Sequence, residues 1–245
     1  KENFVMFQID EILTKSPFSL SEKEKSHLFD EALCFLNDHH YQNCSEYKSI
    51  LDALKYDQNT NYNYEQFPFL PLKLFKDYDL SSIDEAKIFK TMNSSGTSGQ
   101  NVSKIYLDKK NASMQTKVLT KIVSTALGNK RLPMLIIDSQ SIISDRNLFT
   151  ARVAGIIGFS IFGKDVTYAL DENMELDLDK IRNFLLKHKN EKIFIFGFTF
   201  IIWKHFVKYI HDNKVKLPSI DGFLIHGGGW KKLASEEVDN IQFKK

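Results

Sequence analysis

From Lys104 onward, short apolar runs alternate with stretches of helical periodicity, and this alternation constrains the fold more than any other feature of the chain. The apolar runs lie at residues 132–138, 165–170, 192–198 and 220–226, and each has the length of a buried strand. Four strand–helix units in series predict a parallel, right-handed, doubly wound sheet with helices on both faces. The expected fold class is therefore α/β with a mainly parallel sheet.

The segments between these runs predict helices. Residues 147–163 are helical in pattern and end in a glycine, which favours a helix stop. Residues 177–190 begin with acids and end with bases, as the helix dipole prefers. Thr199 is expected to cap the helix after the third run, and residues 231–245 are expected to form a last helix.

The first ninety residues differ from the rest because they offer helices and aromatic loops but no convincing strand. Ser21 and Glu24 have capping-box spacing at the start of an amphipathic pattern over residues 21–40. A tyrosine-rich segment with two prolines follows, which favours an extended connector. We therefore expect a helical leader and connector over residues 1–90 and an α/β core over residues 91–245.

Charge and cysteine content narrow the function classes. The chain carries 33 Lys and Arg against 31 Asp and Glu, a formal net charge of +2, which argues against nucleic acid or an anionic membrane as a bulk partner. The most apolar run, residues 193–203, is far shorter than the ~20 residues that cross a bilayer, so no membrane span is expected. Cys34 and Cys44 show no disulfide pattern and the chain start lacks a secretory signal, so we expect a reducing, cytoplasmic location.

Metal-binding residue types occur, but not in a metal-binding pattern. His27, His39 and His40 lie near the two cysteines in sequence, yet their spacing fits no closed set of zinc ligands, so no metal site is predicted there. Asp138 and Asp145, near the end of the first apolar run, are candidate magnesium contacts, although acids in loops are common on protein surfaces.

The segment at residues 93–106, NSSGTSGQNVSKIY, places four hydroxyl residues and two glycines before a lone lysine. Glycines let the backbone approach a ligand and turn its N–H groups inward, and the hydroxyls add donors, which suits phosphate oxygens. A glutamine follows Gly99, which rules out the Walker A loop, and the GxGxxG fingerprint is absent. On these residues alone, a nucleotide phosphate loop and a Ser/Gly-rich surface turn both remain open.

This segment resembles the phosphate loop of the adenylate-forming superfamily. The matching residues are Ser94, Ser95, Gly96, Thr97, Ser98 and Gly99, followed by the cation Lys104. More narrowly, the chain is similar to the LuxE-type acyl-protein synthetases in FKTMNSSGTSGQNVSKIYLD, RLPMLIIDS, ARVAGIIGFSIFGKDVTYALDENMELD and LIHGGGWKKL. The segments HHYQNCSEYKSIL and FPFLPLKLFK look like the leader region of that family, so the resemblance covers nearly the whole chain.

The resemblance implies an activity. Such enzymes use ATP and Mg²⁺ to activate a fatty acid as an acyl-adenylate, and then pass the acyl group to a cysteine thiol. The six loop residues would hold the departing pyrophosphate, with Lys104 as the nearest cation, about two places later than the loop lysine of the superfamily. The turn formed by Gly227, Gly228 and Gly229 would border adenine and the acyl pocket. Candidates for the wall of an acyl tunnel are Phe159, Phe162, Phe196, Phe198 and Trp203.

The family pattern also implies parts that these residues lack. An adenine-binding aromatic-glycine-glutamate motif, a ribose-binding aspartate and the acyl-accepting cysteine are expected beyond Lys245, and neither cysteine at hand matches that acceptor. The core is therefore expected to be incomplete at its C-terminus, and this fragment alone is expected to be inactive in thioester formation. A reductase or acyl-transferring protein is an expected partner. Two alternatives stay open: a ligase for coenzyme A or a carrier protein, and a non-catalytic acyl- or partner-binding module.

Overall fold

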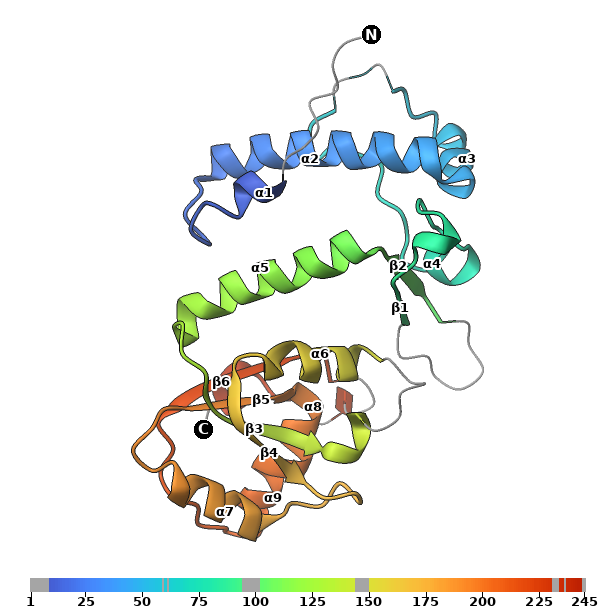
Figure 1. Ribbon diagram of the computed structural model, residues 1–245. Coiled ribbons are helices and arrows are strands. Elements are labelled where there is room, and N and C mark those ends of the chain that lie inside the picture. Colours follow the sequence, from blue (N-terminus) through green and yellow to red (C-terminus); the bar gives the residue numbers. More distant parts are fainter. Residues whose placement is uncertain are drawn as a thin grey trace. The chain divides into compact units, whose positions relative to one another are not determined.

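The computed structural model describes residues 9–58, 60, 62–93, 102–143, 150–230, 234–235 and 237–243 (Figure 1). Its contacts divide the chain into two compact units, Lys1–Thr125 and Ala126–Lys245. The predicted boundary between the helical leader and the α/β core, at residues 90 and 91, stays a prediction. Among the described residues, no helix is both long enough and apolar enough to cross a membrane.

The first unit is built mainly from helices. They are α1 (Ile9–Ile12), α2 (Glu22–Asn43), α3 (Ser45–Ala53), α4 (Leu74–Asp77), the 3₁₀ turn η1 (Glu85–Lys87) and α5 (Lys109–Leu127), which runs into the second unit. The capping box at the start of α2 is confirmed: Ser21 N–H donates to the Glu24 carboxylate at 2.8 Å, and Glu24 N–H donates back to Ser21 Oγ at 3.3 Å. Helix α3 packs on α2 through the fully buried Leu51.

The same unit contains an antiparallel hairpin. Strands β1 (Lys90–Asn93) and β2 (Lys104–Leu107) pair in register, and Asn93 lies opposite Lys104. The strand-like run after the serine-glycine segment is thereby confirmed, whereas β1 was not predicted. The predicted connector, residues 58–75, has no helix in its described residues before Leu74, but α4 begins at Leu74 within it, so the extended segment is shorter than predicted.

The second unit is a four-stranded parallel sheet, so the predicted α/β class is confirmed. Its strands are β3 (Leu132–Ser139), β4 (Gly163–Leu170), β5 (Ile193–Phe198) and β6 (Gly222–Gly227), in the order β4-β3-β5-β6. The helices are η2 (Gln140–Ile143), α6 (Ala151–Ser160), α7 (Leu178–Lys187), α8 (Thr199–Ile201), the π-helix η3 (Ile202–Val207), α9 (Lys208–Asp212) and α10 (Asn240–Phe243). The carboxyl ends of all four strands lie at one edge, where ligands bind in open α/β sheets.

Helices cover both faces of this sheet, as expected for double winding. Helix α6 lies on one face, where Phe159 stacks on Phe196 with ring centroids 4.4 Å apart. Alternate residues of the same strands point to the other face. There Leu135 and Ile137 of β3 and Ile193 of β5 join Ile181, Phe184 and Leu185 of α7 and Ile201 and Ile202 after β5 in one buried cluster.

The structure corrects the predicted helix after β5 and the predicted helix at residues 147–163. Thr199 does not cap the helix after β5: Phe198 is the N-cap residue, because the Thr199 hydroxyl turns toward β6 instead. That helix is also interrupted by the π-helical turn η3. The predicted helix at residues 147–163 is shorter, since Thr150 caps α6 and the glycine expected to stop it, Gly163, begins β4.

The predicted last helix is not continuous in the described residues of its range. Residues 234–235 form a 3₁₀ turn, residues 237–239 are not helical, and α10 is the α-helical part. The Asp239 side chain accepts a hydrogen bond from Gln242 N–H at 2.7 Å, and this cap fixes where α10 begins.

Candidate functional site

The predicted phosphate loop joins the two strands of the hairpin. Ser94, Ser95, Gly96, Thr97, Ser98 and Gly99 lie outside the described residues, so their predicted role stays a prediction. The described flanks show where the segment is attached, because Asn93 and Lys104 pair across the hairpin at the end from which it leaves. Lys104 is thus the first residue of β2, the strand that follows the segment.

Lys104 faces a carboxylate that the sequence did not single out. Its Nζ lies 3.4 Å from Asp79 Oδ1, and the Tyr106 hydroxyl donates to the same oxygen at 2.8 Å. Lys104 and Tyr106 are two residues apart on β2, which places both on one face of the hairpin. The hydrogen bond from Tyr106, and then Lys104, lower the pKa of Asp79, while Asp79 raises the pKa of Lys104. Both partners of this pair are therefore charged near neutral pH.

A small pocket of about 260 Å³ opens beside this pair. It is lined by the segment around α4 and by the start of β2, namely Phe75, Lys76, Asp77, Tyr78, Asp79, Val102 and Lys104. The Lys104 ammonium group therefore stands at a concave surface.

The glycine turn lies at the carboxyl edge of the sheet in the second unit. Gly227 ends β6, and Gly228 has a φ of +81°, a conformation that side chains rarely adopt. A Cβ on Gly228 would stand 3.0 Å from Phe198 Cδ1, whereas one on Gly227 or Gly229 would meet no atom within 4 Å. Only Gly228 is required by the turn itself, and the other two leave bare backbone facing open space.

A polar bridge fixes the start of this turn. Thr199 is a buried residue, 8% exposed, and its hydroxyl lies 2.9 Å from His226 Nδ1 and 3.2 Å from the Gly227 carbonyl oxygen. Because a hydroxyl has one proton, it donates to one of these acceptors, and donation to Gly227 leaves it free to accept from His226 Nδ1–H. Either arrangement ties the end of β5 to the end of β6. Sequence reasoning missed this role because it assigned Thr199 to a helix cap.

Aromatic residues flank the turn in sequence. His226 precedes the three glycines and Trp230 follows them, and both belong to a ring cluster with Trp203 of η3 and Phe243. The ring centroids are 4.8 Å apart for His226 and Phe243 and 5.9 Å apart for the two tryptophans.

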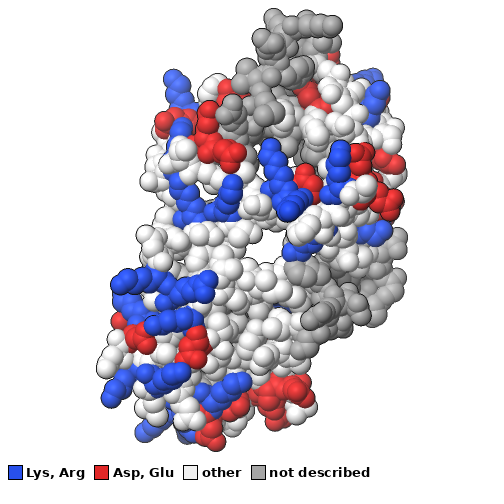
Figure 2. Space-filling view, viewed as in Figure 1, with Lys and Arg blue, Asp and Glu red and all other residues white. Residues whose placement is uncertain are grey.

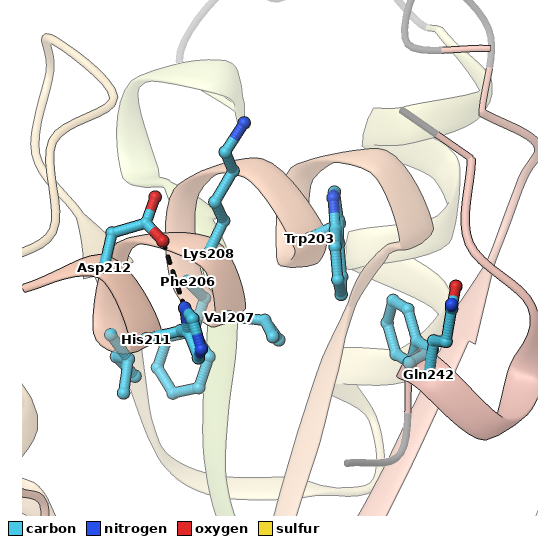
Figure 3. Close-up of a pocket in the computed structure, with 9 residues that line it drawn as sticks. Trp203, Phe206, Val207, Lys208, His211, Asp212 and Gln242 are labelled. Atoms are coloured by element: carbon cyan, nitrogen blue, oxygen red, sulfur yellow. Dashed lines mark hydrogen bonds and ion pairs between the residues drawn. The ribbon is translucent and has the colours of Figure 1, made fainter. Parts of the chain in front are cut away.

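Trp203 and Phe243 of this cluster line a pocket of about 1010 Å³ (Figure 3). The pocket is lined by Trp203, Phe206, Val207, Lys208, Ile210, His211, Asp212, Gln242 and Phe243. In Figure 3, Gln242 of α10 faces the η3 and α9 side, where His211 Nδ1 lies 3.0 Å from Asp212 Oδ1. Most lining side chains are apolar, so the pocket suits an apolar ligand.

Of the five aromatics predicted to line an acyl tunnel, Trp203 lines this pocket. The other four are not among its lining residues: Phe162 and Phe196 are buried, Phe159 stacks on Phe196, and Phe198 lies against Gly228. Phe206 and Phe243 were not among the predicted residues, although the spacing of Phe206 from Trp203 on one helix was a usable signal.

Asp138, considered as a magnesium contact, is buried at the end of β3. Arg152 of α6 binds it with both nitrogens of its fork, through Nε at 2.7 Å from Oδ2 and through Nη2 to Oδ1, and Ser139 N–H donates to Oδ1 at 2.7 Å. Its carboxylate is therefore already satisfied within the protein. Asp145 lies outside the described residues. In the described part of the chain, no group of three or more His, Cys, Asp or Glu side chains is placed to hold a metal ion.

The described cysteines do not form an obvious nucleophile. Both are free thiols, Cys44 is buried, and burial raises the pKa of the half-buried Cys34 thiol. A raised pKa disfavours the thiolate, which is the reactive form.

One of two comparisons places the chain among known proteins. A comparison with curated proteins gives no match. The family profile described as "Acyl-protein synthetase, LuxE" matches residues 1–245, which is the full sequence shown. The phosphate-loop segment, the parallel sheet and the glycine turn all lie within that match, and the chain therefore belongs to the LuxE acyl-protein synthetase family.

Proposed function

We propose that this protein activates a long-chain fatty acid with ATP to an acyl-adenylate and then passes the acyl group to a protein cysteine thiol. One observation carries the proposal beyond family membership. At the carboxyl edge of the sheet the glycine turn is open, and the ring of His226, just before the turn, stacks on Phe243, which lines a large and mostly apolar pocket. Bare backbone beside an apolar pocket suits a ligand with a polar head and a hydrocarbon tail.

The proposed reaction has two balanced steps. A carboxylate oxygen of the fatty acid attacks the α-phosphorus of ATP, and the bond to the β-phosphate oxygen breaks to release pyrophosphate. A thiolate then attacks the acyl carbonyl carbon, and AMP leaves with the electrons of the broken bond. The protein contributes by orienting the reactants and by offering donors where negative charge gathers.

The residues have separate parts in this proposal. The loop residues Ser94 to Gly99, with Lys104, hold the pyrophosphate as it departs, and losing one such donor typically costs ~3 kcal/mol of transition-state stabilisation. The backbone of Gly227 to Gly229 lies against adenine and the start of the acyl chain, and the chain itself enters the pocket beside Trp203. We also propose, as part of the same function, that the protein belongs to the adenylate-forming superfamily.

Magnesium is expected to arrive with ATP. Mg²⁺ keeps several waters and is usually held by substrate phosphates with one or two carboxylates. Of the carboxylates beside the candidate sites, Asp138 is fully engaged by Arg152, while Asp79 is exposed and close to Lys104. The described residues therefore fit phosphate-borne magnesium better than a dedicated protein cage.

The acyl acceptor is proposed to be a thiol other than Cys34 and Cys44. One of these is buried and the other has a raised pKa, so neither has the exposure and thiolate character that acyl transfer needs. Coenzyme A or a carrier-protein thiol would satisfy the same chemistry.

The test is hydroxylamine trapping on the intact natural protein. With ATP, Mg²⁺ and a panel of carboxylic acids of increasing chain length, long-chain acids should yield hydroxamates, and short-chain acids should yield little because they fill less of the apolar pocket. Thr97→Val should slow ATP–pyrophosphate exchange with little change in the melting temperature. No hydroxamate with any acid would overturn the proposed function.

A further inference from the structure

Asp79 holds its two partners unequally. The Tyr106 hydroxyl approaches Asp79 Oδ1 to 2.8 Å, a short and well-formed hydrogen bond, whereas Lys104 Nζ stops at 3.4 Å from the same oxygen. Charged N–H donors normally come to about 2.7–2.9 Å from a carboxylate. Asp79 is therefore anchored by the tyrosine and only loosely engaged with the lysine.

The loose contact binds Lys104 only weakly. An ammonium group has three donors, and among the described residues Asp79 engages one of them at long range, with the Tyr106 hydroxyl nearby. The side chains of Lys104 and Asp79 are 47% and 69% exposed, and an ion pair in such a setting is worth little. A phosphate group carrying two or more charges is a stronger partner for the same ammonium.

The surroundings give an anion a way in. Lys104 and Asp79 both line the pocket of about 260 Å³, and its other charged lining residues are Lys76 and Asp77. An anion that enters meets the Lys104 ammonium and, beside it, the Asp79 carboxylate. The first attracts the anion and the second repels it.

We propose that Asp79 is the resident counter-ion of Lys104, a positioning residue that the phosphates of ATP or pyrophosphate displace from the ammonium while Tyr106 keeps the carboxylate in place. The ligand class rests on the proposed function. An anion that binds must therefore offset the loss of the Asp79 contact, so Asp79 weakens the binding of pyrophosphate at Lys104.

The test compares dissociation constants for inorganic pyrophosphate, measured by titration calorimetry at fixed low salt, in the intact protein and its variants. Asp79→Asn removes the competing charge but keeps the size of the side chain, so it should tighten pyrophosphate binding about two- to five-fold, the range expected for an exposed pair. Lys104→Met should weaken binding, and Asp79→Asn should gain less in that background.

Asp84→Asn is the matched control. Asp84 pairs with Lys87 at 2.7 Å in the same unit and is similarly exposed, so its loss should leave pyrophosphate binding unchanged. If Asp79→Asn fails to fold, Tyr106→Phe replaces it: without the hydroxyl, Asp79 is free to follow Lys104, and pyrophosphate should bind more weakly.

The outcomes separate the two proposals. Pyrophosphate binding that is unchanged or weaker in Asp79→Asn, or unaffected by Lys104→Met, overturns the counter-ion role and leaves fatty-acid activation standing. Absence of pyrophosphate binding in the unaltered protein overturns the counter-ion role and the proposed phosphate site together, whatever hydroxamate trapping shows about the acid.

Discussion

The two edges of the parallel sheet use polar side chains in opposite ways. At the amino edge, His188 Nε2 lies 2.7 Å from Asp165 and its Nδ1 lies 2.7 Å from Glu191, while Lys187 and Lys164 pair with the same two carboxylates at 2.5 Å. These five residues form the amino-edge network. Charged side chains of both signs are intermixed on the visible face that carries α7 (Figure 2).

The carboxyl edge has few charges and more open backbone. Its one buried ion pair in the described residues, Asp138 with Arg152, is closed on itself, and beyond it lie the hydroxyl of Thr199, the ring of His226 and the glycine turn. Groups that satisfy one another stabilise the fold, whereas bare backbone beside a pocket is available to a ligand. In this protein, therefore, the densely paired charges of the amino edge stabilise the fold, whereas the candidate site lies where charged side chains are few and the backbone is open.

The largest expected effect comes from breaking the buried pair. Arg152→Met leaves the Asp138 carboxylate uncompensated in the interior and should lower the free energy of unfolding by about 3–5 kcal/mol. Urea unfolding monitored by circular dichroism measures it. Arg182→Met is the control, because Arg182 lies 3.8 Å from the exposed Asp179 and its loss should cost under about 1 kcal/mol. Equal losses in the free energy of unfolding for Arg152→Met and Arg182→Met would show that the buried pair does not stabilise the carboxyl edge.

The polar bridge should matter more for function than for stability. Thr199→Val removes the hydroxyl that joins β5 to His226 and Gly227, and should cost about 1 kcal/mol of stability. ATP–pyrophosphate exchange should fall at least about ten-fold, because displaced donors and backbone at a reaction site are expensive. Thr199→Ser, which keeps the hydroxyl, should restore exchange. Undiminished exchange in Thr199→Val, which keeps the methyl group and lacks the hydroxyl, would show that the bridge is not needed for activity.

The amino-edge network predicts a pH dependence of stability. Lys187 and His188 lower the pKa of Asp165, and Lys164 and His188 lower the pKa of Glu191, relative to unfolded-chain values of 3.8 and 4.5. Their stabilisation is therefore fully present above those unfolded values and is lost as the pH falls through the lower folded values. Urea midpoints from pH 7 to pH 2 should drop in this acidic window.

The double variant Asp165→Asn with Glu191→Gln tests the source of that dependence. The double variant should be less stable than the parent at pH 7. Its free energy of unfolding should change less between about pH 5 and about pH 2, because it lacks the two carboxylates whose pKa values differ between the folded and unfolded states. An unchanged pH profile would assign the acid sensitivity to other carboxylates.

The smallest expected change in stability comes from filling the open backbone. Gly229 has no positive φ and a Cβ there meets no atom within 4 Å, so Gly229→Ala should shift stability by less than about 0.5 kcal/mol. If adenine or the acyl chain lies on this backbone, the KM for ATP or for the acid should nevertheless rise. Gly228→Ala should destabilise the turn itself, because of its φ of +81° and the nearby Phe198. Unaltered kinetics in Gly229→Ala would move the ligand away from the turn.

Local patterns predicted the elements well where short-range chemistry decides the outcome. The Ser21–Glu24 capping box, the four apolar strands and the amphipathic α7 follow from spacing alone. The predicted cap at Thr199 is wrong because a hydroxyl can bond its own helix or a neighbouring strand, and only the position of β6 settles the choice. The last helix was overestimated because Asp239 starts a new cap within it.

The candidate site likewise has residues that the sequence predicts and contacts that only the folded structure reveals. The serine-glycine segment, Lys104 and the three glycines could be named from sequence, since phosphate binding and close backbone approach require those residue types. Asp79 lies 25 residues from Lys104 in the chain and carries no signal of its own, so its contact with Lys104 and Tyr106 was invisible before folding. The same holds for the stacking of Phe243 on His226.

The sequence by itself determined the class of sheet, the family and the residues that suit a phosphate, because periodicity and residue type are local properties of the chain. Only the tertiary structure decided which polar groups are already engaged and which face open space. That distinction depends on contacts between residues far apart in sequence, and a hydrogen-bonding group is available to a ligand only when no neighbour in the fold has taken it.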